Sequence, residues 1–217
     1  MISTRDLSSM PNVDDLRRLL QSLAMLDAIL SPDWDGRYYS FNSKWARGQQ
    51  MGSMRNGEGD DFFALFHAKG CFLKGFDHES PMSPYRGKTK VVWPGVLDAV
   101  PAEFAKCLVE PAFAIEDTTF CIWQLGNEGW QHGPVEFPTN DSDPDGSLDL
   151  LALLDGRPET YRDWATDYYE QDVDLDAVKH VYQQKPLTRR IVAGLNDEMT
   201  LADFKDDIGE IGYPRTR

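Results

Sequence analysis

The sequence contains little cysteine, and its few cysteines are not arranged as a functional motif. There are three, Cys71, Cys107 and Cys121, which is an odd number, and each lies among apolar neighbours. No two of them form a CxxC motif, which excludes a zinc knuckle or a thioredoxin-like redox couple built on that spacing. We therefore expect all three to be reduced residues of the core.

Long apolar runs are also absent. No window comes near the roughly 18 consecutive apolar residues that a membrane-spanning helix needs. Residues 1–12 lack the apolar stretch after a basic start that is typical of a secretory signal. These absences predict a cytoplasmic protein without a membrane partner, most simply from a bacterium.

Signature motifs of nucleotide-binding and hydrolytic enzymes are missing as well. The string RGKTK at 86–90 resembles the end of a P-loop, but Met82 stands where the first glycine is required. The string NGEGD at 56–60 lacks the third glycine of a dinucleotide loop and connects two strand-like runs. Neither a GxSxG elbow nor an HExxH helix occurs. We predict no cofactor.

What the sequence has in excess is negative charge. Its 217 residues include 36 Asp and Glu and 22 Lys and Arg, for a formal net charge of −14. Residues 140–217 hold 18 acidic and 9 basic residues, so this region carries −9 of that total. Such a surface repels phosphate backbones, which disfavours nucleic acid as a partner, and it attracts basic proteins. Acidity that serves only solubility is the simpler alternative.

The pattern of apolar residues predicts an α+β fold with a central, mostly antiparallel sheet of about five or six strands. Leucines at helical spacing after a good N-cap, Asn12, predict an amphipathic helix that ends before Pro32. Residues 37–76 read as strands, with 61–67 and 70–76 as a hairpin, and two further strands are expected within 118–137. A helix is expected to begin near Pro101.

The hairpin strand DFFALFH is apolar on both faces, so both should be covered. We expect one face to carry Phe62, Ala64 and Phe66, and the other to carry Phe63, Leu65 and His67.

From Ser147 the chain is predicted to be helical, which suggests two regions. The first is an α+β sheet domain at 1–139, and the second is an acidic helical region at 140–217 that packs on the same domain. The loop TNDSDPDG at 139–146 is the expected boundary between them.

The same loop resembles the first half of a calcium-binding loop, in which alternate carboxylates converge on the ion. The candidate ligands are Asp141, Asp143 and Asp145. However, Ala152 occupies the position where a bidentate Glu is needed. An ordinary turn followed by a helix cap at Ser147 is the alternative.

The strongest constellation is Asp77, His78 and Glu79, at the end of the last hairpin strand. A histidine between two carboxylates can act as a general base or a metal ligand. On an extended chain His78 would point away from both acids, so the three side chains converge only if the chain turns. A distant His132 or Asp61 is a further candidate for this site. Alternatively, these polar residues only terminate the strand.

Aromatic residues that lie close together in the sequence offer a different kind of site, because Trp and Tyr combine a large contact area with a polar tip. The candidate binding residues are Trp34, Tyr38, Trp45, Tyr85 and Arg86. Burial of these aromatic rings in the core is the alternative.

Two functional hypotheses follow from these observations. The favoured one is a non-catalytic cytoplasmic binding protein that presents an acidic surface to a basic protein, as an immunity protein does to a toxin or nuclease. The alternative is a hydrolase-like enzyme, with or without a divalent metal, whose site surrounds Asp77, His78 and Glu79.

Overall fold

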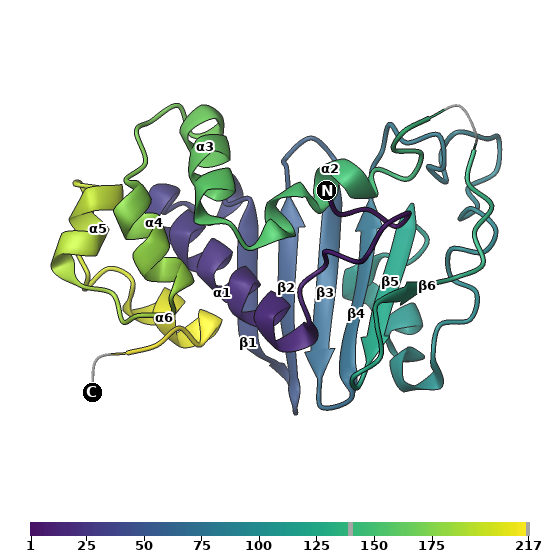
Figure 1. The fold of residues 1–217 in the computed structure, drawn as a ribbon, viewed down its shortest axis with the longest axis horizontal. Coiled ribbons are helices and arrows are strands. Elements are labelled where there is room, and N and C mark those ends of the chain that lie inside the picture. The colour runs from purple at the N-terminus through teal and green to yellow at the C-terminus, as the bar shows by residue number, and fades with distance from the viewer. Residues whose placement is uncertain (139–140, 216–217) are drawn as a thin grey trace.

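The computed structural model describes residues 1–138 and 141–215, and its centre is a six-stranded antiparallel sheet (Figure 1). Each strand pairs with the next along the chain. The strands are β1 (Tyr39–Ala46), β2 (Gln49–Arg55), β3 (Asp61–His67), β4 (Gly70–Phe76), β5 (Phe120–Leu125) and β6 (Gln131–His132). The predicted α+β fold is confirmed. The predicted boundary between 139 and 140 lies outside the described residues.

Helices cover one face of the sheet and surround its β1 edge. They are α1 (Val13–Leu30), α2 (Ser147–Leu150), α3 (Pro158–Tyr168), α4 (Leu175–Tyr182), α5 (Arg189–Leu195) and α6 (Lys205–Ile211). As predicted, the Asn12 side chain caps α1 by accepting from the Asp15 backbone N–H at 3.0 Å. Helix α1 packs on β1 and β2, while α4, α5 and α6 pack against α1 (Figure 1). No helix in the described part of the chain could cross a membrane.

The two faces of the sheet carry two apolar cores, divided as the alternation along β3 predicted. Phe62, Ala64 and Phe66 belong to the core under α1. Phe63 and Leu65 belong to the core on the opposite face. The side-chain period of two along a strand produces this division. The three cysteines are all buried and free, in agreement with the prediction.

Residues 77–119 cover the second face of the sheet without an α-helix, so the prediction of a helix that begins near Pro101 was wrong. Three short 3₁₀ turns stand there instead: η2 (Ala102–Phe104), η3 (Cys107–Val109) and η4 (Pro111–Phe113). Their buried residues, Phe104, Cys107 and Phe113, recur at multiples of three, which matches three residues per 3₁₀ turn. Pro111 also holds the preceding Glu110 in an extended conformation, which ends helical structure.

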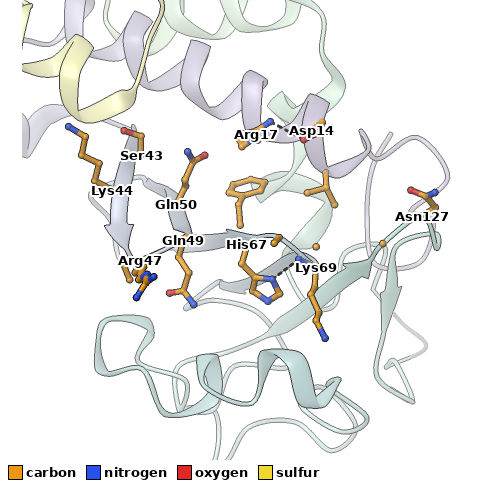
Figure 2. A pocket seen from close by; sticks show the side chains of 17 residues that line it. Asp14, Arg17, Ser43, Lys44, Arg47, Gln49, Gln50, His67, Lys69 and Asn127 are labelled. Atoms are coloured by element: carbon orange, nitrogen blue, oxygen red, sulfur yellow. Dashed lines mark hydrogen bonds and ion pairs between the residues drawn. The ribbon is translucent and has the colours of Figure 1, made fainter.

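The strand order determines what gathers at each end of the sheet. Because consecutive strands are antiparallel, successive connections alternate between the two ends. One end has the β1–β2, β3–β4 and β5–β6 turns, and these turns border a cleft of about 870 Å³ beside the start of α1 (Figure 2). The other end has the β2–β3 turn and the stretch that follows β4.

A buried carboxylate joins α1, the sheet and α3. Asp27, on the buried side of α1, is fully inaccessible to solvent. One oxygen accepts from the Tyr161 hydroxyl of α3 at 2.5 Å, and the other accepts from the Tyr39 backbone N–H of β1 at 2.5 Å. Burial raises the pKa of Asp27 to about 7, although both of these hydrogen bonds act to lower it.

We predict that Asp27 makes the protein less stable as the pH rises from about 4 to about 7. In this interval the unfolded chain loses the Asp27 proton and the folded protein retains it, so the free energy of unfolding falls by up to about 1.4 kcal/mol per pH unit. Asp27→Asn keeps an acceptor and removes the charge. Urea unfolding at several pH values in this interval should show that the free energy of unfolding of the wild type falls with this slope relative to that of Asp27→Asn. Parallel pH profiles of the two proteins would contradict the assignment.

Candidate functional site

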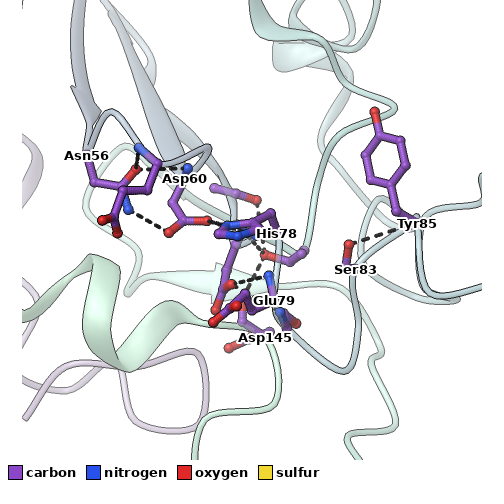
Figure 3. A network of polar contacts seen from close by, with 12 residues as sticks. Asn56, Asp60, His78, Glu79, Ser83, Tyr85 and Asp145 are labelled. Atoms are coloured by element: carbon purple, nitrogen blue, oxygen red, sulfur yellow. Dashed lines mark hydrogen bonds and ion pairs between the residues drawn. The ribbon is translucent and has the colours of Figure 1, made fainter.

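The Asp77–Glu79 stretch lies beside the β2–β3 turn, at one end of the sheet. In the β3–β4 ladder Asp61 is opposite Phe76, so the residues just beyond them, Asp60 and Asp77, face each other. One carboxylate oxygen of Asp60 contacts His78 twice, at 2.7 Å from Nδ1 of the ring and 2.8 Å from the backbone N–H (Figure 3). The register of the sheet therefore gives His78 a carboxylate partner.

Asn56, at the other side of the same turn, fixes the orientation of Asp60. Its amide donates to the second carboxylate oxygen of Asp60 at 2.6 Å. Its carbonyl accepts from the backbone N–H groups of Glu58 at 2.8 Å and Asp60 at 3.0 Å. Gly57 and Gly59 have φ of 79° and 121°, which allows the tight path that these contacts require. Asn56, Asp60 and His78 thus form a chain of hydrogen bonds.

A turn after β4 brings Asp77 to the same place. Its carboxylate accepts from the backbone N–H groups of Glu79 at 2.9 Å and Ser80 at 3.0 Å. Asp60, Asp77 and His78 then each offer a ligand atom within 4.8 Å of the others. The turn that the sequence analysis required is present, but Glu79 is exposed and is not part of this group.

Two segments that are distant in sequence support this corner. Asp145 is buried and accepts from the Thr4 hydroxyl at 2.5 Å, while its backbone carbonyl accepts from the Thr119 hydroxyl at 2.7 Å. The Thr119 hydroxyl oxygen in turn accepts from the Asp77 backbone N–H at 3.1 Å. Gly146 has φ of 76°, and a Cβ there would lie 2.4 Å from the Asp77 side chain. Only glycine allows this close approach.

The electrostatics of the corner favour a charged imidazole. The hydrogen bond that the protonated Nδ1 donates to Asp60 raises the pKa of His78, and burial raises the pKa of Asp77. The His78 side chain is 43% exposed. Because Nδ1 is bonded to Asp60, Nε2 is the ring atom that can bind an external group or transfer a proton. Once Nε2 has lost its proton, an oriented histidine with two carboxylates can act as a general base or hold a divalent metal.

Two other candidates for this site lie elsewhere. Asp61 forms an ion pair at 2.9 Å with the fully buried Lys74. His132 is on β6, where its Nδ1 lies 2.6 Å from the Gly133 carbonyl oxygen. The residues that complete the corner are Asp60 and Asn56, which the sequence analysis did not select. The glycine-rich turn NGEGD was the available signal, since it placed an Asn and an Asp at the mouth of a hairpin.

The acids of the DSDPDG loop bind the protein's own backbone and hydroxyl groups. The Asp143 carboxylate accepts from the N–H groups of Leu148 at 2.9 Å and Asp149 at 3.1 Å, and so caps α2. The prediction that Ser147 caps this helix is therefore wrong. Its hydroxyl instead donates to Asp145 at 2.7 Å. Asp141 accepts from the Asp143 N–H at 2.9 Å. In the described part of the chain, these three acids do not form a group with metal-ligand spacing.

The five candidate binding residues do not form one surface. Trp34 is 50% exposed and stacks on the Arg37 guanidinium, whereas Tyr38 and Trp45 are partly buried against the cores. Tyr85 is 56% exposed, on the loop after β4. Arg86, next to it, lies over the Trp93 ring at 4.3 Å.

An exposed aromatic residue that the sequence analysis did not select belongs to α3. Trp164 and Tyr168 stack with their ring centres 4.8 Å apart, and Tyr38 packs against both. Tyr168 is 42% exposed. Its hydroxyl donates to the backbone carbonyl of Asn56 at 3.3 Å, which connects α3 to the β2–β3 turn.

The helices also enclose an acidic cleft of about 630 Å³. It lies between α3, the α3–α4 connection and α5, and its acidic lining residues are Asp163, Asp167, Asp172 and Asp174. All four are exposed. The cleft has one basic lining residue, Arg162, which pairs with Asp163 at 2.6 Å. Its carboxylates therefore outnumber the charges that neutralise them.

The chain matches no protein family, no curated protein and no solved structure.

We predict that Asp60→Asn lowers the pKa of His78 towards its ordinary value, because the hydrogen bond to Asp60 is the largest cause of the increase. The titration of the His78 ring protons, followed by NMR, measures this shift. Glu79→Gln is the matched control, since Glu79 acts only through a weaker charge effect and should move the pKa less. An equal shift in both variants would refute the pairing.

Proposed function

We propose that this chain is a non-catalytic binding protein that receives a basic protein partner on its acidic helical surface. The observation that carries the proposal is the acidic cleft between α3 and α5. A cleft with excess carboxylates suits the Lys and Arg side chains of a partner, which it would also attract from a distance. This role is of the kind that immunity proteins fill when they neutralise a basic toxin or nuclease.

The charge pattern on α3 supports this proposal. Asp163 and Asp167 are four residues apart on one helix, where like charges repel and destabilise the helix by a few tenths of a kcal/mol. The Asp174 carboxylate caps α4, but Asp167 and Asp172 form no ion pair within the described residues. A basic partner would relieve this repulsion, so binding would be favoured most strongly at low salt.

Aromatic residues on the same helix add contact area for a partner. Tyr168 is exposed beside Asp167, and its stack on Trp164 and Tyr38 keeps the ring ordered before binding. Such preordered aromatic groups are typical anchors of protein interfaces. We assign this role to the cytoplasm, where three free cysteines would stay reduced.

Neutralising the cleft should weaken the complex. Asp167→Asn with Asp172→Asn removes two cleft charges and should lower affinity for a basic partner about tenfold, which is about 1.4 kcal/mol. The measurement is capture of basic proteins from a bacterial lysate at low salt, followed by titration of the recovered protein and its release by added salt. The matched control, Asp98→Asn with Glu128→Gln, removes the same charge at exposed residues outside the cleft.

Recovery of no basic protein across low-salt conditions would contradict the proposal. The same conclusion would follow if the cleft variant and the control bound the recovered protein equally well.

A second candidate function is a metal-dependent hydrolase centred on the corner of Asp60, Asp77 and His78. The observation that favours it is the spacing of these three side chains, whose ligand atoms lie within 4.8 Å of one another. An imidazole and two carboxylates form a ligand set that Zn²⁺ and similar ions accept, with positions left for water. In this reading Glu79, which is exposed at the edge of the corner, is the available general base.

Metal titration tests this second candidate. Zn²⁺ should bind the wild type with displacement of the His78 ring signals in NMR, and His78→Ala should abolish the heat of binding in calorimetry. His180→Ala removes a histidine from α4 and serves as the control. An absence of Zn²⁺ and Mn²⁺ binding at millimolar concentrations would eliminate the metal-dependent enzyme.

A further inference from the structure

The cleft at the opposite end of the sheet is lined mainly by basic residues, although the protein as a whole is acidic. Four basic residues line it, namely Arg17, Lys44, Arg47 and Lys69, together with a single acid, Asp14. The whole chain has 36 acidic and 22 basic residues, so this local excess of positive charge reverses the overall balance. Low-dielectric walls focus such a local field towards a bound anion.

The fold explains why two of these cations, Arg47 and Lys69, lie at the same end of the sheet. Ala46 pairs with Gln49 and His67 pairs with Gly70, so Arg47 and Lys69 occupy two-residue hairpin turns at the same end of the sheet. Figure 2 shows both side chains extending from these turns, with Gln49 between them, while Arg17 lies beside Asp14 on α1. Two strand spacings separate the turns, which is roughly 10 Å.

The cations are only partly neutralised by the protein itself. Arg17 pairs with Asp14 at 2.9 Å, and Lys69 lies 3.8 Å from Glu103, the limit of an ion pair. Lys44 and Arg47 are exposed and form no ion pair across the described ranges 1–138 and 141–215. Adjacent cations with few counter-charges repel one another, and a bound anion removes this repulsion.

Two glutamine side chains add polar groups to the lining of the cleft. The Gln50 side-chain oxygen lies on the α1 side of the cleft and is buried without a hydrogen-bond partner among the described residues. A buried acceptor without a partner costs free energy, and a water or a nucleoside hydroxyl or amino group can donate to it, whereas a phosphate chain, which only accepts, cannot. The Gln49 side chain, on the other side, offers amide donors beside the two turn cations.

We propose that this cleft binds a small molecule with several phosphate groups in a row, such as a nucleotide phosphate chain or a short inorganic polyphosphate. With the two turns roughly 10 Å apart, an extended polyanion can contact Arg47 at one end and Lys69 at the other without drawing the two cations together. The arginine supplies a planar fork of donors that matches phosphate oxygens. The volume of about 870 Å³ lies in the range of small-molecule sites.

Calorimetric titration with tripolyphosphate and with ATP tests the proposal and separates its two sources. Both probes should bind if the phosphate chain alone is recognised, and only ATP should bind if the nucleoside contributes. Arg47→Gln with Lys69→Gln should weaken binding by about tenfold or more, because the change removes the charge-assisted hydrogen bonds to the two ends of the phosphate chain. Circular dichroism and thermal melting confirm that the variants fold.

The matched control is Lys88→Gln with Arg190→Gln, which removes the same charge from exposed residues outside the cleft and should leave the affinity within about twofold. Three results would overturn the proposal. They are an absence of binding of both probes at millimolar concentrations and low salt, equal weakening in the control, and binding of citrate as tight as that of tripolyphosphate.

Discussion

Each strand of the sheet pairs with the strand that follows it in the chain, and the position of every candidate site around the sheet depends on this constraint. Antiparallel pairing of neighbours sends alternate connections to opposite ends. One end therefore collects Asn56, Asp60 and His78 from two connections, while the other collects Arg47 and Lys69 from two more. The sheet separates a corner rich in carboxylates from a cleft rich in cations.

The helical surface depends on a different constraint, the buried carboxyl group of Asp27. A buried carboxyl group without hydrogen-bond partners is costly, so both of its oxygens need partners. Tyr39 and Tyr161 supply these bonds from β1 and α3, and this fixes α3 against α1. The aromatic stack of Trp164 and Tyr168, and the acidic cleft next to it, are placed by the same helix.

Local patterns predicted the elements, and long-range pairing decided the sites. The Asn12 cap and the alternation along β3 depend only on residues that are neighbours in the sequence, so both could be predicted. The 3₁₀ turns around Cys107 follow a period of three that also suits a helix over so short a stretch. The partnership of Asp60 with His78 depends on the β3–β4 register, which the sequence alone leaves open.

Burial was the other quantity that the sequence could not supply. Asp27 interrupts the apolar half of α1, but nothing nearby in the chain indicates that Tyr161 would satisfy it. The acidic composition of residues 140–217 was evident, whereas the gathering of four of those acids at one cleft required the packing of α3 and α5. Composition predicts the sign of the net surface charge, and packing decides where that charge is concentrated.

The contact between Thr4 and Asp145 affects the order in which the molecule can be assembled. These residues are 141 positions apart, yet their hydrogen bond lies in the network that supports the turn of Asp77 and His78. A ribosome releases the hairpins of β1 to β4 long before it releases Asp145. During synthesis, therefore, the sheet can form while the histidine corner still lacks its support, and the corner reaches its final geometry only after most of the chain has emerged.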